Sequence, residues 1–408
     1  MKVFFLTTNI IFWIILLYYT VLTVVGLFQR KKANRLNPLA EYPSLDVLIP
    51  SHNEEIVMKD TLSAMAKLEY PGNIQIYVLN DNSQDKTGEI TEFFANKYAH
   101  IHHIEVPESN EPRGKSRVLN YGLSISDGEY FIVYDADNRP NPDAAIRLME
   151  ITMNTENAAG AVGCVRTLND QNNWLTRFIA IEFKTFQLIM QSGRYALHRI
   201  GSLPGTNMLL KRSIITDLGA YDPYALAEDA ELTIRLSSKG YVIAVDPHSQ
   251  TWEQEPQTLK ALMKQRTRWL QGNLYIMFKF FKEKNWWKKP CIIHLTYYLT
   301  IYVIFGGLLL SSNILFILGL FGFINFNSGI NYLFFWFLAY LTYTIQLLCA
   351  VWYDKKLSAK NVLAASLMYF TYAQLFIFLL VRGLVLMMKD KRNGTVIWDK
   401  TERVAIEK

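Results

Sequence analysis

The chain has 408 residues, of which 50% are hydrophobic and 14% aromatic, and its formal net charge is +6. This length suffices for two domains, and the absence of a basic block interleaved with aromatic residues excludes a nucleic-acid partner. The three cysteines are too scattered for a disulfide framework or a zinc site, so we expect the main domain to lie in a reducing compartment.

An apolar stretch from Phe4 to Phe28 opens the chain, and about 20 such residues suffice to span a bilayer. It is too long for a signal-peptide core and lacks a small-x-small cleavage site. The basic run Gln29 to Arg35 follows directly, which by the positive-inside rule places the next domain in the cytoplasm. We therefore assign residues 1–30 to an N-terminal transmembrane helix.

Strand and helix patterns alternate through residues 40–255. Short apolar strands begin at Leu45, Ile74 and Ile101, and each is followed by polar residues and a helical pattern. This alternation predicts an α/β domain with a mostly parallel sheet and right-handed crossovers. Ligands of such sheets bind at the carboxyl ends of the strands.

The central strand begins at Phe131 and leads into two carboxylates, Asp135 and Asp137. Residues at i and i+2 of a strand point the same way, so both can face one ligand. Hard oxygen ligands suit Mg²⁺ or Mn²⁺, which in turn would hold a diphosphate. Asp81 follows a neighbouring strand and should lie at the same edge of the sheet. For an isolated Asp-x-Asp, a turn rich in aspartate is an equal alternative.

Later in this domain, Trp174 to Leu197 has the pattern of a long amphipathic helix. The loop Gly205-Thr206-Asn207 precedes another apolar strand, and Glu228-Asp229 starts a helix whose positive dipole end suits carboxylates. Because adjacent helical residues diverge, we expect Glu228 to face away from the surface to which Asp229 points.

From Leu259 to Lys289, apolar residues recur at helical spacing among many Lys, Arg and Trp, which is typical of a helix in the membrane interface. We assign residues 256–290 to such interfacial helices. Within them, Gln265 and Arg268 share a face because they are three residues apart. The adjacent Trp269 offers an amphipathic ring.

Residues 291–388 are predicted to form C-terminal transmembrane helices from three apolar blocks, Ile292–Phe326, Tyr332–Tyr353 and Val362–Met388. Ser311 to Asn313 could divide the first block, and polar residues suggest that the third is bent or re-entrant. Basic residues follow the second block at Lys355 and the third block in the tail 389–408, and both groups favour the cytoplasm. Three simple spans cannot place both groups on that side. The number of spans therefore stays open.

Together these stretches resemble the membrane-embedded, processive family 2 glycosyltransferases, which include cellulose, hyaluronan and poly-N-acetylglucosamine synthases. The resemblance covers nearly the whole chain. It rests on four elements in order, namely Asp81, Asp135-Ala136-Asp137, Glu228-Asp229, and Gln265-Arg266-Thr267-Arg268-Trp269, which matches QxxRW. The chain departs from many relatives in having Ala227, where they have Thr. The resemblance implies an α/β GT-A (Rossmann-like) cytoplasmic domain joined to an α-helical transmembrane region.

The resemblance also implies a UDP-sugar donor, with UDP-N-acetylglucosamine and UDP-glucose fitting equally. A carboxylate at Asp81 can accept from the uracil N–H or a ribose hydroxyl, although a helix N-cap is the alternative. Lys115 resembles the nucleotide-site lysine of the family, and a surface position is its alternative. Arg268 can bind the diphosphate bidentately. Asp135, which also contacts the donor, and Asp137 would hold Mg²⁺ or Mn²⁺.

Asp229 is the implied catalytic base, which would take the proton of the acceptor hydroxyl; a helix-start carboxylate is the alternative. The implied acceptor site comprises Gln265, Trp269, Gly205 and Thr206. An indole face suits a sugar that must slide, and a glycine lets the backbone approach it. The segment Trp398 to Arg403 resembles a C-terminal element near the active site of related synthases, and a basic tail fits it equally.

The expected protein is a processive, inverting glycosyltransferase that polymerises a β-linked polysaccharide and exports it across the plasma membrane. It would be a multi-pass membrane protein with a cytoplasmic catalytic domain. Its partners would be the UDP-sugar, the growing polysaccharide and the lipid bilayer; an accessory export subunit stays open. A single transfer to a polyprenyl-phosphate carrier is the alternative. A non-enzymatic scaffold is the third hypothesis, and the intact carboxylates argue against it.

Overall fold

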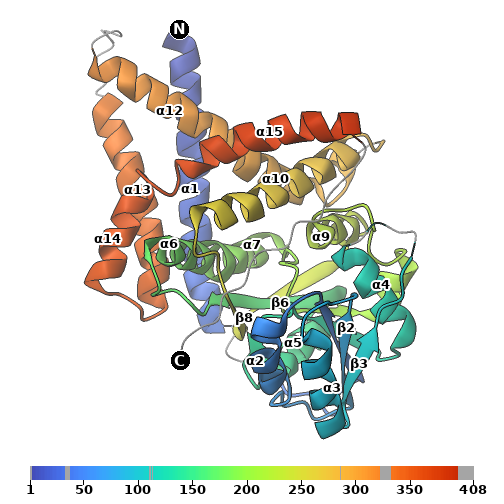
Figure 1. Ribbon diagram of the computed structural model, residues 1–408. Helices are drawn as coiled ribbons and strands as arrows, with labels where there is room; N and C mark the ends of the chain where they lie inside the picture. Colours follow the sequence, from blue (N-terminus) through green and yellow to red (C-terminus); the bar gives the residue numbers. More distant parts are fainter. Residues whose placement is uncertain are drawn as a thin grey trace.

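The computed structural model describes residues 2–32, 37–109, 112, 114–284, 286–321 and 332–393. A domain built on a β-sheet occupies the lower half of the molecule, and long helices rise above it (Figure 1). The segment Trp398 to Arg403 lies outside the described residues, so its resemblance to a family element stays a prediction.

Eight strands of the described chain form one sheet with the order β3-β2-β1-β4-β7-β6-β8-β5. The strands are β1 (Leu45–Ser51), β2 (Ile74–Asn80), β3 (Ile101–Glu105), β4 (Tyr130–Val133), β5 (Arg139–Pro140), β6 (Ala158–Thr167), β7 (Met208–Lys211) and β8 (Val242–Glu253). Strands β3, β2, β1 and β4 are parallel neighbours, as the alternating pattern predicts. Strand β7 is antiparallel to both β4 and β6, so the sheet as a whole is mixed.

The parallel half of the sheet is buried on both faces. Val47, Leu48 and Ile49 in β1 and Ile132 in β4 are fully buried, as is typical of parallel strands covered by helices. The helices of this domain are α2 (Glu55–Met65), α3 (Thr87–Lys97), α4 (Lys115–Ile125), α5 (Ala144–Met153), α8 (Arg212–Asp217) and α9 (Glu228–Ser238).

The long helix predicted after Trp174 is continuous but contains a π-helical stretch. It consists of α6 (Trp174–Phe183), η1 (Lys184–Met190) and α7 (Gln191–His198). Helix α1 (Lys2–Lys32) packs against it at a very short distance. A Cβ atom at Gly193 would lie 2.1 Å from the Leu22 carbonyl oxygen, and one at Gly26 would lie 2.1 Å from that of Ile189. These two glycines allow the N-terminal helix to contact the catalytic domain directly.

The remaining helices are α10 (Leu259–Phe281), η2 (Trp286–Lys288), α11 (Ile292–Leu299), η3 (Thr300–Ile304), α12 (Phe305–Leu320), α13 (Tyr332–Tyr353), α14 (Ala359–Met368) and α15 (Leu375–Asn393). Helix α12 runs through residues 311–313, so the prediction of a break there is wrong. The third apolar block is bent, as predicted, because α14 ends and α15 begins on either side of a turn at residues 369–374.

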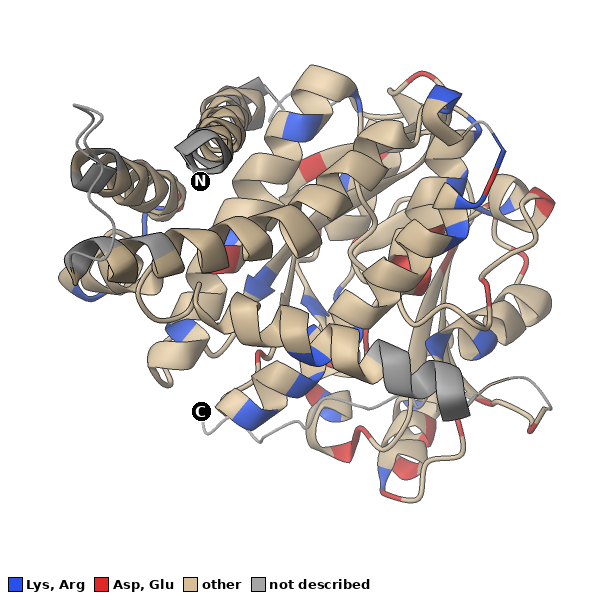
Figure 2. Cartoon of the chain, turned by 90° about the horizontal axis from the view of Figure 1, so that it is seen from above, with Lys and Arg blue, Asp and Glu red and all other residues tan. Residues whose placement is uncertain are grey.

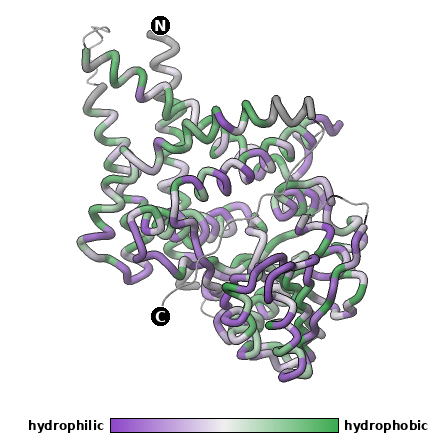
Figure 3. The backbone as a smooth tube through the Cα atoms, in the orientation of Figure 1, coloured by the Kyte–Doolittle hydropathy of each residue, from purple (hydrophilic) through white to green (hydrophobic). Residues whose placement is uncertain are grey.

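Three helical segments of the described chain are long and apolar enough to cross a membrane, Ile10–Gln29, Ile292–Leu318 and Trp336–Tyr353. Apolar residues dominate the upper helices, whereas the sheet domain is mixed (Figure 3). Seen from above, the helix at the N-terminus is almost free of charged side chains (Figure 2). The shorter apolar segment Leu375–Leu386 lies in α15.

Candidate active site

One cavity of about 730 Å³ brings together residues from distant parts of the chain. All but one of the side chains and glycines predicted for the site line it. They are Asp81, Lys115, Asp135, Gly205, Thr206, Asp229, Gln265, Arg268 and Trp269. The exception is Asp137, which is absent from the lining. The structure therefore brings these nine residues, which the sequence analysis placed in one site, to a common cavity.

Asp81 follows β2 at one end of the cavity. Its backbone N–H donates to the Ser51 carbonyl at 2.8 Å, and its carbonyl lies 2.6 Å from His52 Nδ1. Its carboxylate forms an ion pair with Arg117 of α4, whose side chain is only 6% exposed. Sequence reasoning missed both His52, which lines the cavity, and Arg117, because no local pattern links either of them to Asp81.

Lys115 is the first residue of α4 and its side chain is only 13% exposed, so the alternative of a surface lysine is wrong. Its ammonium donates to Asp135 Oδ1 and to the Gly205 carbonyl, both at 2.6 Å, and lies 3.6 Å from Glu228 Oε1. Burial opposes the charge, but Asp135 and Glu228 outweigh it and raise the pKa of Lys115 above its ordinary value. Lys115 therefore remains a cation between two carboxylates, those of Asp135 and Glu228.

The carboxylates of Asp135 and Asp137 do not share an exposed face. Strand β4 ends at Val133, so strand alternation does not continue to these residues. Asp135 is partly exposed in the cavity, whereas Asp137 is 1% exposed and accepts a hydrogen bond from the Gln254 backbone N–H at 3.2 Å. The turn after the strand thus separates the two side chains.

Asp229 lies in the first turn of α9, where its Oδ1 accepts from the Ala230 backbone N–H at 2.7 Å. Burial, followed by the negative charge of Glu228, raises the pKa of Asp229 to about 7. A carboxyl group with such a pKa can accept a proton near neutral pH and release it again. The prediction that Glu228 faces elsewhere is wrong, because both residues line the cavity at the irregular start of the helix.

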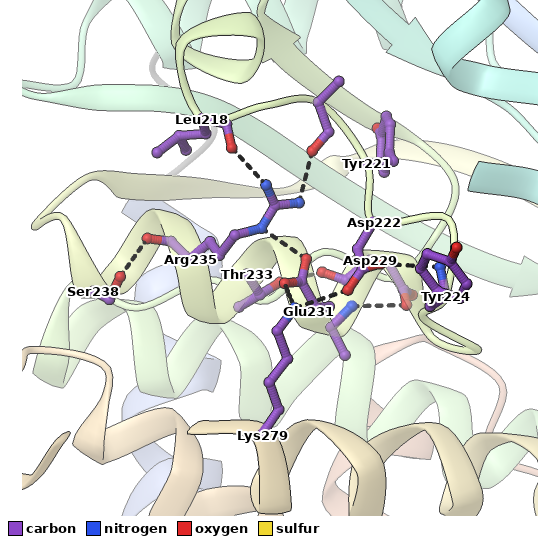
Figure 4. A network of polar contacts seen from close by, with 12 residues as sticks. Leu218, Tyr221, Asp222, Tyr224, Asp229, Glu231, Thr233, Arg235, Ser238 and Lys279 are labelled. Atoms are coloured by element: carbon purple, nitrogen blue, oxygen red, sulfur yellow. Dashed lines mark hydrogen bonds and ion pairs between the residues drawn. The ribbon is translucent and has the colours of Figure 1, made fainter. Parts of the chain in front are cut away.

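A buried network fixes the helix that carries Asp229 (Figure 4). Glu231 is fully buried and accepts from Arg235 Nε and from Lys279 Nζ of α10, both at 2.7 Å. Lys279 also donates to Asp222 at 2.8 Å. Arg235 donates to the Leu218 and Ala220 carbonyls of the preceding loop. Helix α9 is therefore tied both to α10 and to the loop that precedes it.

Helix α10 contributes Gln265, Arg268 and Trp269 to the cavity, and its intervening Arg266 is directed elsewhere. Arg266 forms an ion pair with Glu182 of α6 at 2.6 Å, and the same carboxylate accepts from the Tyr372 hydroxyl at 2.6 Å. The Arg266 guanidinium lies 4.1 Å from the centre of the Trp269 ring. The indole is thereby held against a buried charge.

A second cavity, of about 250 Å³, lies among the apolar helices. Side chains of α1, α12, α13 and α15 line it, and most of them are aliphatic or aromatic. Trp269, Phe183 and Tyr302 are among the residues that line both cavities, so the two cavities adjoin at the Trp269 ring.

The residues of the cavity supply part of the ligand set that a divalent cation needs. Asp135 presents a hard carboxylate ligand to the cavity, and this region already accommodates the ammonium of Lys115. Within the described residues, no group of three or more His, Cys, Asp and Glu side chains is arranged to hold a metal. Additional oxygen ligands would therefore have to come from a diphosphate or water, as is usual for Mg²⁺.

Sequence comparisons relate the chain to known glycosyltransferases. Residues 43–272 match the profile of the family described as "Glycosyltransferase like family 2". A protein of Bacillus subtilis named "Probable glycosyltransferase YdaM" is 39% identical over 98% of this chain and 97% of its own length. A poly-beta-1,6-N-acetyl-D-glucosamine synthase of Staphylococcus epidermidis is 24% identical over 96% of both chains.

Among solved structures, the mannosyltransferase PcManGT of Pyrobaculum calidifontis, in complex with GDP-Man and Mn²⁺, has a similar fold. Its TM-score is 0.59 at 17% sequence identity, and the match covers 94% of this chain and 99% of that one. The likeness confirms the predicted fold, a GT-A-like sheet domain combined with helices.

Proposed function

The chain belongs to the family 2 glycosyltransferases, and we propose that it is a processive, inverting enzyme that polymerises a β-linked polysaccharide from a UDP-sugar. We further propose that it lies in the plasma membrane with its sheet domain in the cytoplasm and passes the product outward. The observation that carries this proposal is that the polar cavity adjoins the apolar one at Trp269, whose side chain lines both.

The donor would occupy the end of the cavity between Asp81 and Lys115. Asp81 would accept a hydrogen bond from the nucleoside, while Lys115 and Arg268 would neutralise the diphosphate. Asp135 holds Lys115 in place with a 2.6 Å hydrogen bond. Helix α4 would thus support both ends of the donor site, because its first residue is Lys115 and its Arg117 pairs with Asp81.

The acceptor would lie over Trp269 with its hydroxyl at Asp229. Asp229 removes the hydroxyl proton as the oxygen attacks the anomeric carbon from the side opposite the diphosphate. The new glycosidic bond forms while the bond to the diphosphate oxygen breaks, and UDP departs with that electron pair. This in-line displacement inverts an α-linked donor to a β-linked product.

Asp135 would hold a Mg²⁺ or Mn²⁺ ion, which would supply charge neutralisation for the departing diphosphate, whereas Asp137 does not line the cavity. The Mn²⁺ in the solved mannosyltransferase supports this choice of ion. Lys115 would contribute a second positive charge from the protein itself, because its raised pKa keeps it protonated.

Similarity to a poly-beta-1,6-N-acetyl-D-glucosamine synthase over nearly the whole chain favours UDP-N-acetylglucosamine as donor and a polymer as product. A single transfer to a polyprenyl-phosphate carrier is the second candidate, because the lining of the second cavity would also accommodate a hydrocarbon chain. The two candidates predict different products from the same donor.

The test uses full-length protein purified in detergent. UDP release is measured with UDP-N-acetylglucosamine and with UDP-glucose, with Mg²⁺ or Mn²⁺ and with excess EDTA, and products are digested with linkage-specific glycosidases. We expect metal-dependent UDP release and a glycosidase-sensitive polymer from one donor, and neither from the Asp229→Asn variant. A single sugar on an added polyprenyl phosphate, without polymer, would favour the second candidate. Full activity in EDTA would contradict the metal role of Asp135.

A further inference from the structure

We propose that Arg117 is a positioning residue that makes the nucleotide end of the cavity selective for uracil by fixing the Asp81 carboxylate. This inference rests on the proposed function, because it assumes that Asp81 faces the nucleoside. The geometry that points to it is an ion pair between the two side chains. Asp81 lines the cavity, whereas Arg117 is buried beside it and does not.

Arg117 is buried by the surrounding helix and loop. Its Nη2 pairs with Asp81 Oδ1, and its Nη1 donates to the Pro107 carbonyl at 2.8 Å. Its neighbours Lys115 and Val118 on α4 line the cavity, whereas Arg117 does not. Arg117 can therefore influence a bound nucleotide only through Asp81 or through the loop at Pro107.

The pairing determines what the Asp81 side chain can recognise. A guanidinium on one carboxylate oxygen restricts the rotation of the group, and a carboxylate is a pure hydrogen-bond acceptor. Uracil presents an N3–H donor between two carbonyls, whereas the N3 of cytosine carries a lone pair. A fixed carboxylate would accept from uracil and would repel cytosine.

Two other roles would leave different signatures. If Asp81 accepted from a ribose hydroxyl instead, affinity would depend on the sugar and not on the base. If Arg117 only supported the loop at Pro107, its loss would weaken every nucleotide equally. Comparing UDP, CDP and 2′-deoxy-UDP therefore separates these roles from the proposed one.

The experiment measures binding of these three nucleotides by titration calorimetry to full-length protein in detergent. The variants are Arg117→Ala, Arg117→Lys and, as matched control, Arg139→Ala, which loses a partly exposed ion pair with Asp60. We expect wild type to bind UDP about tenfold or more tightly than CDP, as one charged hydrogen bond allows. Arg117→Ala should lose most of that preference, and Arg117→Lys should retain part of it. Arg139→Ala should resemble wild type.

If Arg117→Ala still prefers UDP over CDP to the same degree as wild type, the inference is overturned. An equal loss of affinity for all three nucleotides would also overturn it. A penalty for 2′-deoxy-UDP without base preference in wild type would also overturn it. If Arg117→Ala does not fold, Arg117→Lys decides, because it keeps the charge but cannot form both of the original contacts. Failure of wild type to bind UDP at all would instead contradict the proposed donor class.

Discussion

At the scale of single residues, the protonation of the site depends on four side chains that share one corner of the cavity. Lys115 lies between Asp135 and Glu228, and Glu228 raises the pKa of the adjacent Asp229. Because Lys115 stays charged while Asp229 titrates near neutrality, the same cluster can bind an anionic donor and accept a proton from a neutral hydroxyl.

The first prediction concerns the pH dependence of Asp229, whose pKa is raised to about 7. Only the ionised form can act as a base, so the transfer rate should rise with pH and level off above about 7. One unit below that value it should fall to roughly a tenth of the plateau. Initial rates of UDP release between pH 5.5 and 8.5 provide the measurement, and a flat profile would argue against Asp229 as the base.

The same shift predicts an effect on stability. The folded protein binds the Asp229 proton more tightly than the unfolded chain does, because the ordinary pKa is 3.8. The resulting stabilisation is complete below about pH 3.8 and is lost as the pH rises through about 7. Asp229→Asn should therefore stop transfer while raising the thermal unfolding temperature above pH 7. Lower stability of this variant at pH 8 would contradict the raised pKa of Asp229.

The second prediction concerns Gly205, which has φ +86°, a value that L-residues rarely adopt. A Cβ atom there would lie 3.1 Å from Asp229 Oδ2 and 3.6 Å from Lys115 Nζ. Gly219 also has φ +86°, but a Cβ atom would meet nothing within 4 Å. Gly219→Ala therefore isolates the backbone strain.

Both glycine variants should lose about 1–2 kcal/mol of stability from the left-handed backbone alone. Only Gly205→Ala should also lose kcat, because it crowds the acceptor side of Asp229. Thermal unfolding and steady-state rates, measured together, test this expectation. Equal rates in the two variants would show that the space beside Asp229 is not critical for transfer.

At the scale of elements, α10 has two functional faces. One face directs Gln265, Arg268 and Trp269 into the polar cavity, and the other holds Arg266 against Glu182 and Tyr372 of the helical region. The helix also packs closely on the start of α9. A Cβ atom at Gly272 would lie 2.6 Å from Ala227 Cβ, in the residue before Glu228. Movement of α10 would therefore displace both Trp269 and Asp229.

The third prediction is that Trp269→Ala shortens the product without impairing donor binding. The indole would be the flat surface on which the newest sugar rests, and its loss should weaken acceptor binding by about tenfold, or roughly 1.4 kcal/mol. Radiolabelled product sized on a gel, together with UDP calorimetry, measures both effects. Trp287→Ala, which removes an exposed indole, is the control. Wild-type product length in Trp269→Ala would mean that Trp269 is only a membrane-interface anchor.

At the scale of the whole molecule, a buried ion pair joins the sheet domain to a candidate membrane helix. Arg166 at the end of β6 contacts both carboxylate oxygens of Asp354, which follows α13, at 2.6 and 2.7 Å. Both side chains are only 6% exposed, and Lys184 lies 3.6 Å from the same carboxylate. These charges connect β6, η1, which begins at Lys184, and the end of α13 at one point.

The fourth prediction is that Asp354→Asn strongly destabilises the protein. Removing one partner of a buried ion pair costs about 3–5 kcal/mol, because the remaining charge stays buried. Asp60→Asn, which breaks a partly exposed pair with Arg139, should cost at most about 1 kcal/mol. Thermal unfolding in detergent compares the two variants. Similar unfolding temperatures would show that the Arg166 pair does not hold the two halves together.

The sequence by itself determined the elements and the order of the motifs. Hydrophobic periodicity is local, so it correctly located the parallel strands and the helix after Trp174, and polar residues correctly indicated the bend in the last apolar block. The strand-end rule correctly predicted that Asp81 and Asp135 lie at the same edge of the sheet, where both line one cavity, because parallel strands align their carboxyl ends. The sequence did not show that β4 ends at Val133. The prediction that Asp135 and Asp137 share a face assumed that the strand continues, and it was therefore wrong.

Only the tertiary structure decided which charges are paired. Arg117 and Asp81 are 36 residues apart, Lys115 and the Gly205 carbonyl are 90 apart, and Arg166 and Asp354 are 188 apart. No periodic pattern connects such positions, and a lone basic residue looks the same whether it is solvated or buried. Its partner, its burial and its protonation arise together when the sheet and the helices pack, because burial makes an unpaired charge unfavourable.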